Sequence, residues 1–159
     1  MAQHIAYLGL GANLDDAAHT VRQAIVQLNG AAMTVLAQSS LYRSAPVDAQ
    51  GPDFYNAVLK IATALKPGVL LQTLLQLEQQ HGRTRAYRNA PRTLDIDLLL
   101  YDDLILHEAG LTLPHPRLHE RAFVLLPLLE IAPGIVLPRL GAAKNFLPQC
   151  ADQLIEQVT

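Results

Sequence analysis

The sequence has 159 residues, of which half are apolar, and a formal net charge of −2 at pH 7. Its length predicts one domain over residues 1–159, and its charge gives no general attraction to nucleic acid or to anionic membranes. The start lacks the basic segment of a signal peptide, no apolar run approaches the roughly 20 residues that cross a bilayer, and the single cysteine, Cys150, cannot form an internal disulfide. We therefore expect a cytoplasmic protein.

The N-terminal segment predicts a strand followed by a helix. Residues 4–10 are apolar and include β-branched and aromatic members, which favours a buried strand. The acidic pair Asp15–Asp16 suits the positive end of a helix dipole. Apolar side chains then recur at helical spacing from Val21 to Leu28, and Asn29–Gly30 ends the pattern.

The central segment predicts two strands and a second helix. Residues 33–43 and residues 54–64 favour strands, and they are separated by a loop at residues 44–53 with two prolines, a glycine and two aspartates. An amphipathic helix is expected over residues 67–81, because Pro67 is tolerated in the first turn of a helix.

The C-terminal half predicts one more strand and two helices. Residues 82–93 are polar and arginine-rich, which indicates a loop, and residues 94–101 favour a strand for which residues 103–107 are a candidate hairpin partner. Helices are expected at about 118–131 and roughly 142–157. The resulting β-α-β-β-α-β order is the ferredoxin-like arrangement, an α+β sheet with helices packed on it.

Asp95 and Asp97 form the most specific chemical feature of the sequence. Since one residue separates them on a predicted strand, their side chains point to the same face, with α-carbons about 6.5–7 Å apart. Two carboxylates among apolar neighbours offer the oxygen ligands that Mg²⁺ combines with substrate phosphates and waters. A bare Asp-x-Asp is also typical of an edge strand whose charges face solvent. The arginine-rich segment directly before the strand favours the metal site.

The arginines of this segment predict phosphate binding. The chain has nine arginines but only three lysines, and a guanidinium matches phosphate oxygens better than an ammonium group. Four of the nine lie close together: Arg83, Arg85, Arg88 and Arg92. Such a cluster on a mildly acidic protein indicates one small polyanion. Neither a Walker A loop nor a dinucleotide fingerprint is present, so Gly9 and Gly11 are expected to form a structural turn after the first strand.

Two other patterns allow both a functional and a structural interpretation. His115, held between two prolines, suits a phosphate or ribose contact and suits a structural turn histidine equally well. Phe54 and Asn56 share one face of a predicted strand, where a ring and an amide could stack and recognise a flat heterocycle. The same pattern is more common in ordinary strand packing.

Taken together, these segments resemble the 6-hydroxymethyl-7,8-dihydropterin pyrophosphokinase family from about residue 5 to residue 140. The signature of that family is a basic residue, a small residue, Pro-Arg and then Asp-x-Asp in an apolar strand. It stands here as Arg88, Ala90, Pro91, Arg92, Asp95, Asp97, Leu98 and Leu99. Other similar blocks are YLGLGANL, SSLYRSAPV, DFYNAV and LPHPRLHERAFVLLPL. Gly110 departs from the pattern, because some relatives carry there an arginine that touches the nucleotide.

The resemblance implies a ferredoxin-like core in an α/β/α sandwich and an active site. Asp95 and Asp97 would bind two magnesium ions that bridge the ATP phosphates. Arg83 and Arg92 would assist the transfer. The other residues implied for the nucleotide and its phosphates are Glu78, Arg85, Arg88, Leu98, Thr112, His115 and Arg121. The pterin would stack between Phe54 and Phe123, and the groups implied to recognise its edge are Asn56, Ser44, Ala45, Pro46 and Val47.

The implied reaction is transfer of diphosphate from ATP to the hydroxymethyl group of the pterin, with release of AMP. The implied partners are these two small molecules, without nucleic acid or membrane, and we expect a monomer. Two alternatives remain open at this point: a non-enzymatic ferredoxin-like module that binds RNA or a metabolite, and a kinase acting at the γ-phosphate, whose nucleotide product would be ADP.

Overall fold

A six-stranded sheet forms the centre of the computed structural model, which describes residues 3–14, 16–46, 51–81 and 94–158. Its strands are β1 (His4–Ala12), β2 (Thr34–Gln38), β3 (Tyr42–Ser44), β4 (Phe54–Thr63), β5 (Asp95–Tyr101) and β10 (Ile155–Gln157). Their order across the sheet is β10-β3-β4-β1-β5, β2 pairs with β4, and every pairing is antiparallel. The ferredoxin-like order expected from the sequence is therefore confirmed.

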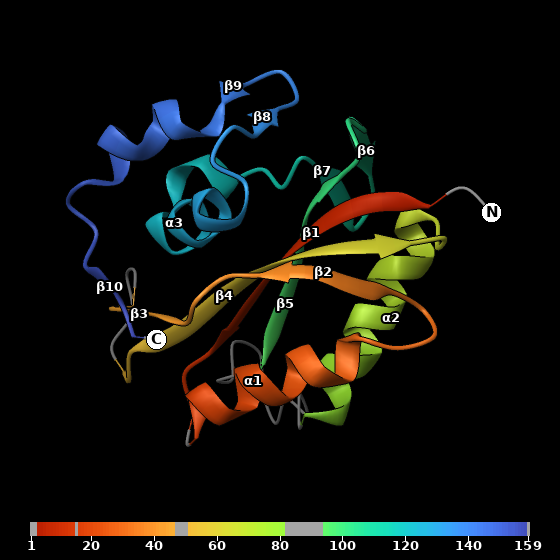
Figure 1. Cartoon of the computed structure of the whole chain (residues 1–159), viewed down its shortest axis with the longest axis horizontal. Helices are drawn as coiled ribbons and strands as arrows, with labels where there is room; N and C mark the ends of the chain where they lie inside the picture. The colour runs from red at the N-terminus through yellow and green to blue at the C-terminus, as the bar shows by residue number, and fades with distance from the viewer. Residues whose placement is uncertain (1–2, 15, 47–50, 82–93, 159) are drawn as a thin grey trace.

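Helices cover both faces of this sheet (Figure 1). On one face lie α1 (Ala17–Leu28) and α2 (Pro67–Gln80), which bury a core that includes Leu8, Ile25 and Leu74. On the other face, α3 (Ala122–Ile131) and the 3-10 helix η2 (Ala143–Cys150) bury a second core around Val58 and Leu125. The chain is thus an α/β/α sandwich. In the described part of the chain, no helix has the length and apolar character needed to cross a membrane.

The strand expected at residues 33–43 is wrong as one element, because it divides into β2 and β3. Between them, the Ser39 hydroxyl accepts a hydrogen bond from the backbone N–H of Val58 at 2.9 Å. A buried serine side chain therefore replaces a backbone group of the ladder and interrupts the strand. Both pieces still pair with β4.

The hairpin considered between β5 and residues 103–107 is also wrong. β6 (Leu106–Glu108) pairs instead with β7 (Leu111–Leu113), which follows it in the chain. The turn between them requires Gly110, whose φ of 81° lies in the left-handed region that side chains disfavour. This turn gives a physical reason for glycine at position 110.

The helix expected at 118–131 is interrupted at one residue. η1 (Leu118–Glu120) is a single 3-10 turn, and α3 begins two residues later. Arg121 between them is extended, with φ −118° and ψ 115°. The side chain of Arg121 therefore points in a different direction from the one it would have in a continuous helix.

The helix expected at 142–157 is only half correct. η2 covers Ala143–Cys150, but the chain then extends and β10 pairs with β3, so that Ile155 lies opposite Ser44. This pairing satisfies backbone groups of β3 that no neighbouring strand would otherwise reach. A small ribbon, β8 (Val136–Leu137) with β9 (Gly141–Ala142), precedes η2 and was not expected.

A glutamate on α3 fixes the helix to β3. The carboxylate of Glu130 accepts hydrogen bonds from the backbone N–H and hydroxyl of Ser40, and from the hydroxyl of Tyr42 at 2.7 Å. Burial acts to raise the pKa of Glu130, but these hydrogen bonds outweigh it and hold the pKa below its ordinary value. The native state therefore favours the charged form of this carboxylate.

We predict that Glu130→Gln lowers the free energy of unfolding at pH 7 by about 1 kcal/mol. A fully buried carboxylate with these hydrogen bonds would contribute more, because solvent screens the charge of an exposed group. Because the pKa of Glu130 is lower in the folded state, its contribution is present above the ordinary value of 4.5 and is lost as pH falls through the folded-state pKa. Thermal unfolding of both proteins at pH 7 and near pH 3 would measure this. The exposed Glu108→Gln is the control, and equal differences from wild type at both pH values would contradict the prediction.

Candidate active site

The antiparallel register places the acidic pair beside two glycines and an amide. Gly11 lies opposite both Asp95 on β5 and Asn56 on β4, while Gly9 lies opposite Asp97. Directly paired residues of antiparallel strands project to the same face, so these side chains share the face covered by α3. The two carboxylates therefore project together, as the sequence predicted.

Gly9 and Gly11 are part of β1, so the turn expected at this position is wrong. A Cβ on Gly11 would lie 3.1 Å from the side-chain oxygen of Asn56, and a Cβ on Gly9 would lie 3.4 Å from the Leu99 side chain. Neither glycine has a left-handed φ, so the reason for glycine here is space. Both residues line the floor of a cavity above the sheet.

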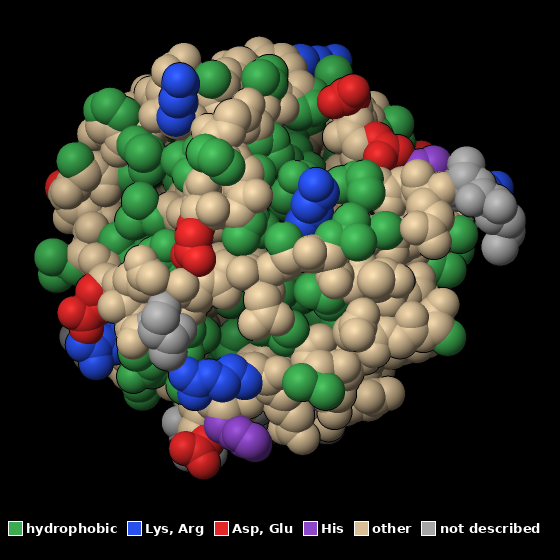
Figure 2. Space-filling view, in the orientation of Figure 1, with side chains coloured by type: hydrophobic (Ala, Val, Ile, Leu, Met, Phe, Trp, Pro, Cys, Tyr) green, Lys and Arg blue, Asp and Glu red, His purple; other side chains and the backbone are tan. Residues whose placement is uncertain are grey.

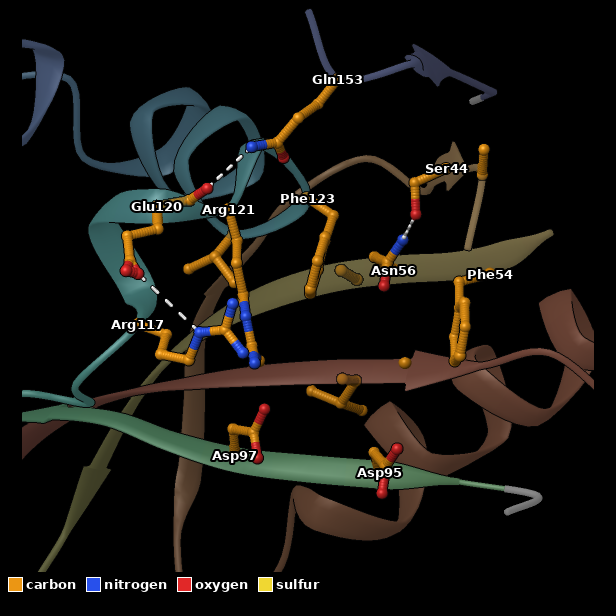
Figure 3. Close-up of a pocket in the computed structure, with 16 residues that line it drawn as sticks. Ser44, Phe54, Asn56, Asp95, Asp97, Arg117, Glu120, Arg121, Phe123 and Gln153 are labelled. Carbon is orange, nitrogen blue, oxygen red and sulfur yellow. Dashed lines mark hydrogen bonds and ion pairs between the residues drawn. The ribbon is translucent and has the colours of Figure 1, made fainter. Parts of the chain in front are cut away.

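This cavity, of about 350 Å³, has aromatic walls and an amide at its base. Figure 3 shows Phe54 and Phe123 on opposite sides of the space, with Asn56 between them near the sheet. Asn56 is only 3% exposed, and its Nδ2 donates to the hydroxyl oxygen of Ser44 at 2.8 Å. The second polar atom of the amide stays beside Gly11. This arrangement suits a flat ring with hydrogen-bonding groups along its edge.

Two arginines from the η1 region enter the cavity above Asp97 (Figure 3). The guanidinium of Arg121 lies 5.5 Å from the ring centroid of Phe123. Burial and the nearby Arg117 lower the pKa of Arg121, while Asp97 opposes this, and the group stays charged because guanidinium pKa values lie far above neutrality. Arg117 is more exposed and forms a loose ion pair with Glu120 at 3.8 Å. Two cations directed at one cavity favour an anionic ligand.

A second cavity, of about 320 Å³, meets the first at Asp97. Three residues predicted to bind the nucleotide, Leu98, Thr112 and His115, line it together with Gly110. Burial lowers the pKa of His115, Asp97 acts to raise it, and Arg121 and Arg117 add to the lowering. The imidazole is therefore neutral at pH 7. Its Nδ1 accepts a hydrogen bond from the Arg117 backbone N–H at 3.2 Å, which orients the ring.

The structure brings together most of the residues predicted for the site. Those lining the two cavities are Ser44, Ala45, Phe54, Asn56, Asp95, Asp97, Leu98, Thr112, His115, Arg121 and Phe123. Pro46 lines a smaller cavity beside the first. The predicted roles of Val47, Arg83, Arg85, Arg88 and Arg92 concern positions outside the described residues.

Glu78 lines neither large cavity. It is 3% exposed, and its carboxylate accepts a hydrogen bond from the backbone N–H of Ile96 at 2.6 Å. Because Ile96 stands between Asp95 and Asp97, this bond fixes the part of β5 that carries the acidic pair. A contact between Glu78 and the nucleotide stays a prediction.

The acidic pair fits a hard divalent cation that is completed by a ligand. Asp95 and Asp97 are partly exposed to the first cavity. Among the described residues there is no group of three or more Asp, Glu, His or Cys side chains that could hold a metal. Two carboxylates without a protein cage match Mg²⁺, which keeps several waters and binds substrate phosphates.

Sequence reasoning missed eight residues that line the first cavity: Gly9, Leu10, Gly11, Ala57, Arg117, Glu120, Val124 and Gln153. The two glycines alternate with apolar residues along a strand, and this spacing could have indicated that one face of the strand lacks side chains and forms the floor of a cavity. Arg117 stands two residues from His115 and could have been inferred from that motif. Gln153 carries no signal in the sequence, because only the tertiary structure brings it to the cavity.

Comparisons with known proteins agree with this geometry. Residues 7–133 match the family model described as 7,8-dihydro-6-hydroxymethylpterin-pyrophosphokinase (HPPK). The chain is 44% identical to a 2-amino-4-hydroxy-6-hydroxymethyldihydropteridine pyrophosphokinase from Synechocystis sp., over 98% of this chain and 76% of the relative. It is 42% identical to the protein of the same name from Haemophilus influenzae, over 92% and 93%.

Solved structures show the same fold. A crystal structure of Plasmodium falciparum HPPK-DHPS wild type with pteroate superposes with a TM-score of 0.74 at 14% identity. The alignment covers 93% of this chain and 42% of the other, so the chain spans less than half of that protein.

We predict that Gly11→Ala weakens pterin binding about tenfold and leaves the fold intact, because the added methyl group lies 3.1 Å from the Asn56 side-chain oxygen and displaces the amide. Isothermal titration calorimetry with the pterin would measure the change. Gly68→Ala on α2, where a Cβ meets nothing within 4 Å, is the matched control. Unchanged affinity in Gly11→Ala would exclude this role for the floor of the cavity.

Proposed function

Because this chain belongs to the 7,8-dihydro-6-hydroxymethylpterin-pyrophosphokinase family, we propose that it transfers diphosphate from ATP to 6-hydroxymethyl-7,8-dihydropterin, with release of AMP, in folate biosynthesis. The position of Asp97 carries this proposal, since that residue lines both large cavities. A nucleotide in one cavity and a flat acceptor in the other would meet at this carboxylate.

The pterin binds in the cavity between Phe54 and Phe123. Its ring stacks between the two aromatic side chains, and its edge forms hydrogen bonds with Asn56 and with backbone groups of residues 44–47. The hydrogen bond from Asn56 to Ser44 supports this role, because it fixes the amide before the ligand arrives. A pre-oriented amide also selects a ligand whose edge matches it.

The nucleotide binds in the cavity formed by Leu98, Thr112 and His115. Neutral His115 offers a hydrogen bond without adding charge, and the triphosphate extends past Asp97 toward Arg121. The arginines expected at the phosphates are Arg83, Arg85, Arg88 and Arg92. Together with Arg121 they would balance the charge of the triphosphate.

Asp95 and Asp97 hold two magnesium ions in this proposal. When bound, the metal neutralises charge on the phosphate oxygens and orients the triphosphate. The carboxylates are suited to this because both project from β5 into the first cavity, and Glu78 fixes the strand between them.

The reaction is an in-line displacement at the β-phosphorus. The pterin hydroxymethyl oxygen forms a bond to that phosphorus, the bond from the phosphorus to the oxygen of AMP breaks, and the hydroxyl proton passes to solvent water. Phe54 and Phe123 hold the attacking group in place, which supplies orientation. Arg92, Arg83 and Arg121 stabilise negative charge on the transferred group.

Neither alternative function is favoured by a specific observation. On the face in Figure 2, the described Lys and Arg side chains lie singly among apolar and acidic ones and offer RNA no continuous basic track. A kinase acting at the γ-phosphate would share the same cavities. We propose, from the sequence, that the protein acts as a monomer in the cytoplasm.

An assay with ATP, Mg²⁺ and the hydroxymethyl dihydropterin tests the proposal directly. AMP and the pterin diphosphate are the expected products. ADP as the nucleotide product would identify γ-phosphate transfer instead, and the absence of any pterin-dependent nucleotide product would refute both enzymes.

We predict that Asp97→Asn lowers turnover by a factor of at least about 10³, because loss of metal-mediated charge stabilisation is worth several kcal/mol. Its melting temperature should stay within a few degrees of wild type. Asp103→Asn, an exposed change just beyond β5, removes the same charge and should keep full turnover. Near-normal AMP formation by Asp97→Asn would show that the metal assignment is wrong.

A further inference from the structure

We infer that Gln153, in the C-terminal segment, is a positioning residue for the pterin cavity, which it serves by holding Arg121 and Phe123 in place. This inference deepens the proposed function and rests on it for the identity of the ligand. The sequence gives no indication of it, since Gln153 lies 32 residues beyond Arg121 in the numbering.

Gln153 forms hydrogen bonds with the residues on both sides of Arg121. Figure 3 shows the one to Glu120. The Nε2 of Gln153 donates to the backbone oxygen of Glu120 at 2.8 Å, and its Oε1 accepts from the backbone N–H of Ala122 at 2.8 Å. The second bond caps the N-terminus of α3, where Arg121 itself provides no side-chain cap. One amide thus fixes both residues next to the extended arginine.

The position of this arginine sets the wall of the cavity. Arg121 interrupts the helical path between η1 and α3, and its guanidinium lies over the ring of Phe123. If the turn changed its backbone angles, the guanidinium and the ring would both move. Gln153 restrains that turn from outside the sheet.

The C-terminal segment also reaches the opposite side of the cavity. Ile155 of β10 pairs with Ser44, and the backbone N–H of Ala45 donates to the backbone oxygen of Leu154 at 3.3 Å. Ser44 orients Asn56. Residues 153–155 therefore connect two parts of the cavity. One is the stacking wall, formed by Phe123 with Arg121 over its ring, and the other is β3, which carries groups proposed to bind the edge of the pterin.

Phe123 packs against the second core and also borders an empty space. A further cavity of about 230 Å³ is lined by Phe123 and Gln153 together with Ala45 and Leu154. Among the described residues, none fills this space, so the part of the ring that borders it gains no packing there. The hydrogen bonds of Gln153 add a restraint at this side of the wall.

Gln153→Leu tests the inference, because it removes both hydrogen bonds while keeping a similar size. We expect the Kd for the pterin to rise about tenfold, and the Kd for adenosine, which has no phosphates for Arg121 to contact, to change less than twofold. The cavity formed by Leu98, Thr112 and His115 is expected to be spared since Gln153 does not line it. A rise in both Kd values, or in neither, would overturn the inference.

Gln157→Leu is the matched control on the same segment. In the wild-type chain the Nε2 of Gln157 donates to the hydroxyl of Ser40 at 2.9 Å, and Gln157 lines none of the three cavities. Both variants should lower the melting temperature modestly, but only Gln153→Leu should weaken pterin binding. If Gln157→Leu raised the pterin Kd equally, the effect would be one of general attachment and the inference would be wrong.

A second measurement does not depend on the reaction. The chain has only three phenylalanines, so 4-fluorophenylalanine labelling should give three ¹⁹F resonances, which Phe→Leu variants would assign. In Gln153→Leu the Phe123 signal should shift or broaden while that of Phe54 stays unchanged. A wild-type chain without AMP formation would refute the proposed function, whereas an unperturbed Phe123 signal would refute the role of Gln153.

Discussion

The register between β1 and its two neighbours is the constraint on which the site depends. It sets Asp95 and Asp97 beside Gly11 and Gly9, and it sets Asn56 on the far side of Gly11. Because the central strand has no side chains at these positions, the ligand space can reach down to the backbone. A shift by one residue would turn the carboxylates toward the α1–α2 core, where they could not hold a metal ion.

One face of the sheet mainly stabilises the fold, and the other face carries the candidate active site. The face under α1 and α2 is filled by apolar side chains such as Leu8 and Leu74, which are fully buried. The opposite face is apolar only beneath α3 and η2, and it opens into the cavities beyond. The Arg121 interruption separates η1 from α3 and directs a charged side chain into that opening.

Local patterns in the sequence predicted the features that depend on local periodicity. The order of strands and helices, the shared face of the acidic pair and the pairing of Phe54 with Asn56 on one strand face all follow from spacing along single elements. The wrong predictions concern places where contacts with distant segments of the chain determine the local structure. Ser39 interrupts a strand by bonding to β4, and residues 155–157 extend because β3 needs a partner. Gln153 could not be predicted for the same reason.

The two cavities also differ in how the chain builds them. All lining residues of the proposed nucleotide cavity except Leu71 come from residues 96–116, so a single stretch of chain forms most of it. The proposed pterin cavity takes residues from β1, β3, β4, β5, α3 and the C-terminal segment, which only the complete fold brings together. Its shape therefore depends on long-range contacts that local fluctuations can loosen first. The stacking wall, restrained by hydrogen bonds from distant residues, is the part of the site most sensitive to changes far from the chemistry.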